Sequence, residues 1–354
     1  MKKIFKFIYF VLFIPLVSCI EEIDMTHYEH EDKIVVNSLF SPDSNFYVRI
    51  SKSTGLNEAV YGHSQDFSGD DSIRLDFDKW YIKPVRVKDA NVELWKNDKF
   101  LEKLLYTRLG VFRSVNEIPE PNQKYEVRVS ASGLESVTAD DMLPQKVNII
   151  SANFEDAGFC FDNYGYFVKI TITFKDPADD KNYYEILLPD TTWYDDFNDG
   201  NLIDSVGYYV YYNQLRTDDP VVLAEGEQDF ICRSFVFSDD MINGQIYEAT
   251  IYLFIGSDVE GTVDYTGFSQ AIELRTVSRK YYLYRKKMRK YLNYKFSGTD
   301  LEQIYTIGDP VIMYTNVENG YGVFVGYSAD TVILTEKDQV NPLYSCKNEV
   351  NCMN

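Results

Sequence analysis

Short segments in the first third of this chain alternate strictly between apolar and more polar residues, and this pattern constrains its fold the most. Residues 46–51, 85–88, 91–94 and 125–131 all follow it. A period of two residues places one set of side chains on each face of a β-strand, as in antiparallel sheets with one buried face. We therefore predict an immunoglobulin-like β-sandwich over residues 31–144, although the Cys…Trp…Cys pattern of antibody domains is absent.

Alternation resumes after Pro144, which marks a domain boundary because proline ends regular strand pairing. We expect a second β-rich domain over residues 145–345 and a short C-terminal tail over residues 346–354. Its predicted strands are 168–175, 183–188, 230–237, 246–255, 322–327 and 331–334. The predicted fold class is therefore mainly β.

One segment of the second region follows a helical period instead. Apolar residues at spacings of three and four predict an amphipathic helix near residues 271–294: Leu274, Val277, Tyr281, Tyr284, Met288 and Tyr291. Its other face is basic and includes Arg279, Lys280, Lys286, Lys287 and Lys290. Three interpretations stay open: pairing with acids of its own domain, contact with anionic lipid phosphates, or docking on a protein partner.

Acidic residues dominate the rest of the chain. The sequence has 55 acidic and 35 basic side chains, for a formal net charge of −20. This sign argues against nucleic acid as a partner, because phosphate binding needs positive charge. A hydrophobic content of 45% is enough to form a core, so the chain is not expected to be disordered.

The N-terminus has the organisation of a secretory signal. Basic residues precede a short apolar run from Ile8 to Leu16, which is too short to span a bilayer. The run ends in Leu16-Val17-Ser18-Cys19, which resembles the bacterial lipobox. That resemblance implies removal of residues 1–18 and acylation of Cys19, and two or more acyl chains give stable membrane anchoring. Residues 19–30 then form a tether, and no later segment is long and apolar enough for a transmembrane helix.

Acidic residues follow the lipobox cysteine directly, in the order Ile20-Glu21-Glu22-Ile23-Asp24. The stretch resembles the export signal of Bacteroidota lipoproteins that reach the outer cell surface. The resemblance implies an outer-membrane protein, anchored by lipid and facing the cell exterior. The alternative is a solvated acidic linker in a chain that is acidic throughout.

Four cysteines remain once Cys19 is assigned to lipidation: Cys160, Cys232, Cys346 and Cys352. An exported chain meets oxidising conditions, so we expect disulfides, for which three connectivities exist. Pairing of Cys346 with Cys352 closes the smallest loop and leaves Cys160 with Cys232. Free thiols are the alternative, and the spacing is not that of a zinc site.

Several segments together resemble the Bacteroidota outer-membrane lipoproteins grouped as domain of unknown function 4249. Besides the lipobox, these segments are 34–37, 89–94, 125–129, 174–177, 183–184, 240–244 and 278–284. The run Tyr314-Thr315-Asn316-Val317-Glu318-Asn319-Gly320-Tyr321-Gly322-Val323-Phe324 is the most specific. The resemblance implies a surface lipoprotein that serves as an accessory or cap subunit of a TonB-dependent transporter or another outer-membrane barrel. It supplies no catalytic residues.

A search for catalytic motifs gives no convincing site. HExxH, GxSxG and Walker patterns are all absent from the sequence. Acidic residues gather in two predicted loops, 56–83 and 190–205, and Asp195–Asn201 invites comparison with a calcium loop. Phe197 stands there where an EF-hand needs an oxygen ligand, so a solvated loop is the simpler interpretation. We predict no cofactor, no metal and no enzymatic activity.

Aromatic pairs supply the alternative function. Trp80-Tyr81 and Trp193-Tyr194 are candidate contacts for a ligand or partner, since such rings anchor interfaces, although strand packing also explains them. A stand-alone glycan- or peptide-binding module is therefore the second hypothesis, and a hydrolase that uses an acidic loop is the third.

Overall fold

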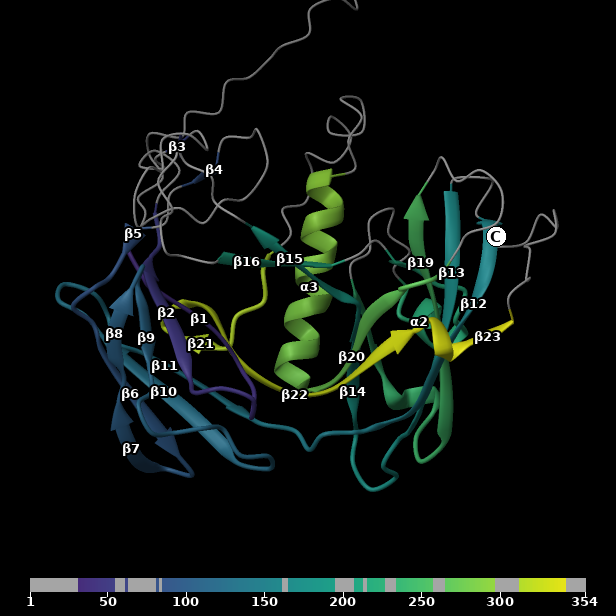
Figure 1. The fold of residues 1–354 in the computed structure, drawn as a ribbon. Helices are drawn as coiled ribbons and strands as arrows, with labels where there is room; N and C mark the ends of the chain where they lie inside the picture. The colour runs from purple at the N-terminus through teal and green to yellow at the C-terminus, as the bar shows by residue number, and fades with distance from the viewer. Residues whose placement is uncertain are drawn as a thin grey trace, which may run out of the picture. The chain divides into compact units, whose positions relative to one another are not determined.

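A computed structural model describes residues 31–54, 61–62, 81–82, 85–160, 165–194, 207–212, 215–226, 234–256, 265–296 and 312–341. The chain divides into two compact units, one made of Met1–Asp32 and Thr54–Pro84 and the other of Lys33–Ser53 and Val85–Asn354. The described part of the first unit holds a two-stranded antiparallel ladder of β3 (Tyr61–Gly62) and β4 (Tyr81–Ile82). All elements described below belong to the second unit, and Figure 1 labels most of them.

Two sheets pack against each other in the N-terminal part of this unit. Strands of the first sheet, in spatial order, are β1 (Ile34–Phe40), β2 (Tyr47–Lys52), β9 (Val111–Arg113) and β8 (Leu105–Arg108), with β5 (Val85–Arg86) also paired to β2. Strands of the second are β21 (Val317–Glu318), β11 (Val137–Met142), β10 (Lys124–Ser130), β6 (Asn91–Lys96) and β7 (Lys99–Lys103). Val48 of the first sheet and Val127 of the second lie in one buried cluster, as the alternation predicts.

The turn between β6 and β7 shows how local sequence sets this register. Asn97 and Asp98 both have positive φ angles, 48° and 62°. Two consecutive left-handed residues match the right-handed twist of a tight hairpin, and Asn and Asp tolerate that conformation well.

The C-terminal part extends the first sheet and contains one further large sheet. The strands that continue the first sheet are β18 (Ser234–Ser238), β14 (Tyr183–Leu187), β20 (Ser269–Val277) and β22 (Tyr321–Thr335). The other sheet has β17 (Leu215–Arg216), β19 (Ile246–Gly256), β13 (Gly165–Lys175), β12 (Ile149–Cys160) and β23 (Gln339–Asn341). A separate ladder joins β15 (Pro189–Tyr194) to β16 (Gly207–Tyr212), and short helical segments are α2 (Pro220–Ala224), η5 (Asp239–Met241) and η6 (Glu336–Asp338). Ile272 and Ile170 lie in the core that the two sheets share.

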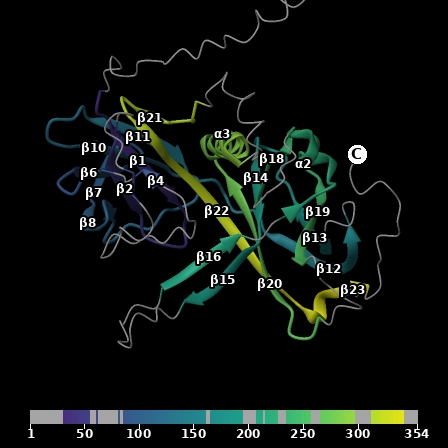
Figure 2. The same cartoon turned by 90° about the horizontal axis from the view of Figure 1, so that it is seen from above.

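Strand β22 connects the two parts. Its first half pairs in parallel with β1, from Tyr321 opposite Val35 to Gly326 opposite Phe40. Its second half pairs antiparallel with β20 and completes a nine-stranded sheet. Figure 2 shows it as one continuous yellow strand between the β1 and β20 regions. The predicted strands 322–327 and 331–334 are thus one strand, and a segment of the predicted second domain completes the sheet of the first.

A glycine permits the close approach of β22 to β1. Gly322 has a φ of 96°, and a Cβ atom built there would lie 2.0 Å from the carbonyl oxygen of Val36. Any larger residue would push the two strands apart at the point where the parallel pairing begins.

The helix prediction is correct in type but wrong in its start. Helix α3 spans Arg279–Phe296, whereas residues 271–277 belong to β20 and Ser278 separates the two elements. Leu274 fits both periods. In the structure, burial alternates from Ser269 to Leu274, with Ile272 and Leu274 buried and Glu273 between them partly exposed, as expected for a strand.

The predicted mainly β class is confirmed, and an immunoglobulin-like strand order stays a prediction. Within the described residues, no helix has the length and apolar character needed to cross a membrane.

Candidate binding site

A hollow of about 570 Å³ lies on the face of the nine-stranded sheet beside α3. Its lining comes from the β1–β2 loop, the connection before β12, the start of β15, and strands β20 and β22. The residues are Ser41, Asp43, Ser44, Lys146, Pro189, Glu273, Arg275, Tyr327, Ala329, Asp330 and Thr331. Polar and charged side chains prevail, which is uncommon for a small-molecule pocket.

The alternation of β20 creates the floor of this hollow. Ile272 and Leu274 point into the core, so Glu273 and Arg275 point to the opposite face. Thr331 and Ala329 of β22 lie directly opposite Glu273 and Arg275 in the antiparallel register. Cross-strand neighbours share a face, so the four residues lie side by side.

Arg275 is fixed by contacts on several sides. Its Nε donates to Glu273 Oε1 at 2.6 Å, and its Nη1 donates to Tyr281 OH at 3.0 Å. The guanidinium carbon lies 4.3 Å from the ring centroid of Tyr327, which is a favourable cation–π distance. The side chain is therefore held rigidly with 11% of its surface exposed.

Glu185 of β14 lies beneath α3 and is fully buried. Its carboxylate is 2.7 Å from Arg285 Nη2 and 3.4 Å from Arg275 Nη1, and it accepts a 2.5 Å hydrogen bond from Tyr281 OH. Burial alone would raise the pKa of Glu185, but the two guanidinium groups lower it to about 2. The helix is thus attached to the sheet through an ionised carboxylate.

A second carboxylate holds the start of α3. Ser278 precedes the helix, and its hydroxyl oxygen accepts from Tyr281 N at 3.0 Å, the arrangement of an N-cap. The same hydroxyl donates to Asp141 of β11, which also accepts from Gly326 N at 2.9 Å. Burial raises the pKa of Asp141 to about 6, against the opposing effect of these hydrogen bonds. Asp141 therefore links β11, β22 and α3.

The basic residues of α3 divide into two groups. Lys280 lies 3.1 Å from Asp140, and Lys286 lies 3.0 Å from Glu225, so both pair with acids of their own chain. Arg279, Lys287 and Lys290 are exposed and have no ion-pair partner among the described residues. One predicted face therefore has two roles: part of it attaches the helix, and part of it faces outward.

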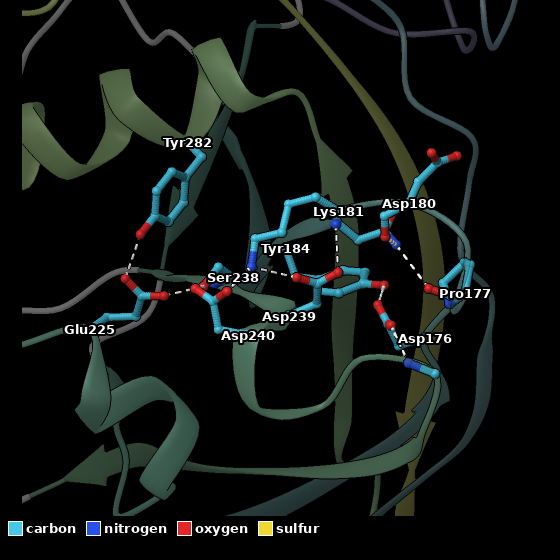
Figure 3. A network of polar contacts seen from close by, with 12 residues as sticks. Asp176, Pro177, Asp180, Lys181, Tyr184, Glu225, Ser238, Asp239, Asp240 and Tyr282 are labelled. Atoms are coloured by element: carbon cyan, nitrogen blue, oxygen red, sulfur yellow. Dashed lines mark hydrogen bonds and ion pairs between the residues drawn. The ribbon is translucent and has the colours of Figure 1, made fainter.

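Figure 3 shows the polar network along the other flank of the helix. Glu225 accepts from Tyr282 OH at 2.5 Å and from Ser238 N at 2.7 Å. Farther along, Lys181 bridges Asp239, at 2.7 Å, and Asp240. Each of these acids has protein donors, so the cluster is a structural support rather than an open cation site.

The same network includes a buried tyrosine–carboxylate pair. Tyr184 OH donates to Asp176, whose second oxygen accepts from Gly244 N at 2.8 Å. Asp176 is fully buried, and its two donors replace the water that it loses on folding. Among the described residues, no group of three or more His, Cys, Asp or Glu side chains is arranged to hold a metal ion.

Many predicted site residues fall outside the described residues or at their edge. Those outside are Cys19, Trp80, Cys232, Cys346 and Cys352, together with most of the acidic loops 56–83 and 190–205. The backbone places Cys160 at the end of β12, Tyr81 in β4, and Trp193 and Tyr194 in β15. The disulfide and aromatic-contact predictions therefore stay predictions.

Sequence reasoning missed the hollow itself. Its lining combines five separate segments, which only the tertiary fold brings together. The available signal was the pair Glu273 and Arg275, an acid and a base spaced by two on a strand whose other face is apolar. Assigning those residues to a helix concealed it.

Comparisons with known proteins identify a family but no activity. A family described as Domain of unknown function (DUF4249) matches residues 20–333. No functionally curated protein matches the chain. Among solved structures, the chain is similar to a candidate membrane-anchored protein from Corynebacterium diphtheriae, with 8% identity and a TM-score of 0.20. The alignment covers 71% of this chain and spans only 55% of that protein, and at this TM-score the likeness does not extend to function.

Proposed function

The chain belongs to the DUF4249 family, and on that premise we propose that it is a non-enzymatic, lipid-anchored protein of the outer cell surface. In this proposal it works as an accessory or cap subunit of an outer-membrane barrel, with a TonB-dependent transporter as the expected partner. The observation that carries the proposal is the lipobox at Leu16–Cys19, followed by a short acidic tether and a mainly β body. Anchoring of this kind confines a protein to the membrane surface and raises its effective concentration at a partner there.

The outward face of α3 supports a partner. Arg279, Lys287 and Lys290 are exposed on a chain whose net charge is −20. A local patch of opposite sign steers association with an acidic surface and fixes its orientation. The acidic remainder repels that same surface, so the contact would form at α3.

Purification of the tagged, full-length protein from detergent-solubilised outer membranes tests this proposal. We expect a barrel protein to co-purify with it, and the triple variant Arg279→Glu, Lys287→Glu, Lys290→Glu to reduce the yield of that barrel at least about tenfold, as loss of several charge contacts predicts. The matched control reverses three exposed lysines of the N-terminal sandwich, Lys88, Lys99 and Lys103, and should retain the barrel. Recovery of the wild-type protein without any barrel would contradict the proposal.

A stand-alone glycan- or peptide-binding module is the second candidate function. The observation in its favour is the polar hollow beside α3. Two of the three carboxylates that line the hollow are held by cations, Glu273 by Arg275 and Asp330 by Lys146, which suits recognition better than acid catalysis. A general acid needs a carboxyl group that keeps its proton near neutral pH. Asp141, whose pKa is raised to about 6, is buried and does not line the hollow.

A further inference from the structure

The hollow beside α3 has the size of a ligand site and the lining of a polar one. Its volume of about 570 Å³ falls within the range of about 300–1,000 Å³ typical of small-molecule pockets. Such pockets are mostly apolar, whereas Tyr327, Ala329 and Pro189 are the apolar contributors here. A ligand that binds here must therefore replace the hydrogen bonds that the polar lining residues make to water, and burial of apolar surface contributes little.

The floor presents a donor beside an acceptor. Glu273 uses Oε1 to accept from Arg275 Nε. No described residue forms a hydrogen bond with Glu273 Oε2 or with Arg275 Nη2. Both side chains line the hollow and keep 15% and 11% of their surface exposed. Within the described part of the chain, the pair thus leaves one acceptor and one donor without a partner, side by side on the same strand face.

A wall of the hollow repeats this arrangement. Lys146 Nζ lies 3.1 Å from Asp330 Oδ1, while Asp330 Oδ2 accepts from Ile149 N at 2.9 Å. Lys146 has two further N–H groups to offer. Hydroxyl groups of Ser41, Ser44 and Thr331, each a donor and an acceptor, stand around the two pairs.

Charges in the hollow are nearly balanced. Arg275 pairs with Glu273, and Lys146 pairs with Asp330. Among the described residues, only Asp43 of the lining charges has no ion-pair partner. A phosphate or another anion would gain little here, and the paired carboxylates leave little for a cation.

The recognition groups are also held in place before any ligand arrives. Arg275 is fixed by Glu273, Glu185 and Tyr281 and lies over the Tyr327 ring. Side chains that are already ordered lose little conformational entropy on binding, which favours affinity.

We propose that this hollow is the binding site of a neutral oligosaccharide. Each sugar hydroxyl donates and accepts, so a pair of neighbouring hydroxyls can satisfy Arg275 Nη2 and Glu273 Oε2 together. A second pair is matched by Lys146 and Asp330. This inference rests on the second candidate function, to which it adds a site and a ligand class. Binding at this site needs no barrel partner.

A peptide fits the same surface less well. Extended peptides bind by adding a strand to a free sheet edge, with pockets for alternate side chains. Strands β20 and β22 are interior to the sheet, and their backbone groups pair with β14, β1 and each other. Only side chains are offered to a ligand there, which suits a compact polyol.

Binding of neutral oligosaccharides to the lipidated, full-length protein in detergent micelles tests the proposal. The probes are malto-, manno-, xylo- and galacto-oligosaccharides, presented on an array and then titrated by calorimetry. We expect binding to at least one series. Thr331→Trp, an exposed position of the lining, should fill the hollow and weaken that binding at least tenfold. Ile333→Trp, two residues along the same strand, 61% exposed and outside the lining, is the matched control and should bind like the wild type.

A second variant separates recognition from space. Glu273→Gln keeps the shape of the side chain and an oxygen that accepts from Arg275, but it replaces the free acceptor by a donor. We expect this variant to bind the oligosaccharide more weakly than the wild type. Its circular dichroism spectrum should match that of the wild type, which shows that it is folded. The proposal is overturned if no neutral oligosaccharide binds, if only peptides bind, or if Thr331→Trp binds as tightly as Ile333→Trp. Each of these results leaves co-purification of a barrel unaffected, so the two tests fail independently.

Discussion

Glu185 and Asp141 are two buried carboxylates that hold the same helix by different means. Glu185 lies under the first half of α3 and is surrounded by Arg275, Arg285 and Tyr281. Asp141 lies at the start of the helix and meets only a hydroxyl and backbone N–H groups, with Lys280 acting at longer range. Nearby guanidinium groups therefore keep the first carboxylate ionised, whereas the second carboxylate gains a proton easily.

Opposite pKa directions give the two attachments opposite responses to acid. The pKa of Glu185 is lowered to about 2, so its ionised form stabilises the folded state. The raised pKa of Asp141, about 6, makes its protonated form the stabilising one. Although both carboxylates are buried, the one held by charged groups stabilises the fold when it is ionised, and the one held by neutral donors stabilises it when it is protonated.

The largest expected effect comes from removing the charged attachment. Glu185→Ala leaves two guanidinium groups without their shared carboxylate, and breaking a buried ion pair in this way costs about 3–5 kcal/mol. We expect this loss in the free energy of unfolding, measured by urea denaturation at pH 7. Glu248→Gln, an exposed acid of β19, is the control and should change stability by less than about 0.5 kcal/mol. Equal losses in the two variants would show that Glu185 has no special role.

The next effect concerns pH and Asp141. Its folded-state pKa of about 6 exceeds the unfolded value of 3.8, so the folded state binds the proton more tightly. Stability from this group is fully present below about pH 4 and is lost as the pH rises through about 6, a total of about 3 kcal/mol. Asp141→Asn should remove this component from the unfolding free energy measured at several pH values.

Glu185 supplies the internal comparison for that experiment. Its stabilisation is present above pH 4.5 and is lost only as the pH falls toward 2, so it contributes no slope between pH 5 and 7. A variant Asp141→Asn with the same pH profile as the wild type between pH 4 and 7 would contradict the difference between the two attachments.

The smallest effect comes from the surface of α3. Lys280 pairs with Asp140 while its side chain is 34% exposed, so Lys280→Ala should cost less than about 1 kcal/mol. Lys287 is exposed and has no such partner among the described residues, and Lys287→Ala should leave stability unchanged within about 0.5 kcal/mol. Urea denaturation measures both losses. The difference between the two variants should be smaller at about 0.5 M salt than at low salt, because salt screens exposed charges. A larger loss for Lys287→Ala than for Lys280→Ala would refute the division of the basic face.

The sequence predicts much of the strand content because each strand carries its own period. Segments 125–131, 168–175 and 246–255 correspond closely to β10, β13 and β19. Their alternation reflects one buried face, and burial is set locally by which residues are apolar. The mainly β class follows from this alone.

Long-range pairing and shared residues are what local patterns conceal. Leu274 and Val277 fit a helical stripe, yet Leu274 packs in the core as part of β20. Nothing near Val36 indicates that its parallel neighbour is Gly322, because that contact depends on the whole chain between them. The hollow also depends on long-range contacts. Its residues are visible in the sequence one by one, but the sequence does not show that they lie together.

The place of β22 also sets the order in which the chain can fold. Strand β1 is made early in synthesis, whereas β22, which flanks it in parallel, follows nearly all the other described strands of this unit. The N-terminal sheet therefore stays incomplete until β22 has also been made. Contacts between such distant segments form slowly because a long loop must close first. The sheet that joins the two parts of this unit is therefore expected to close late in folding.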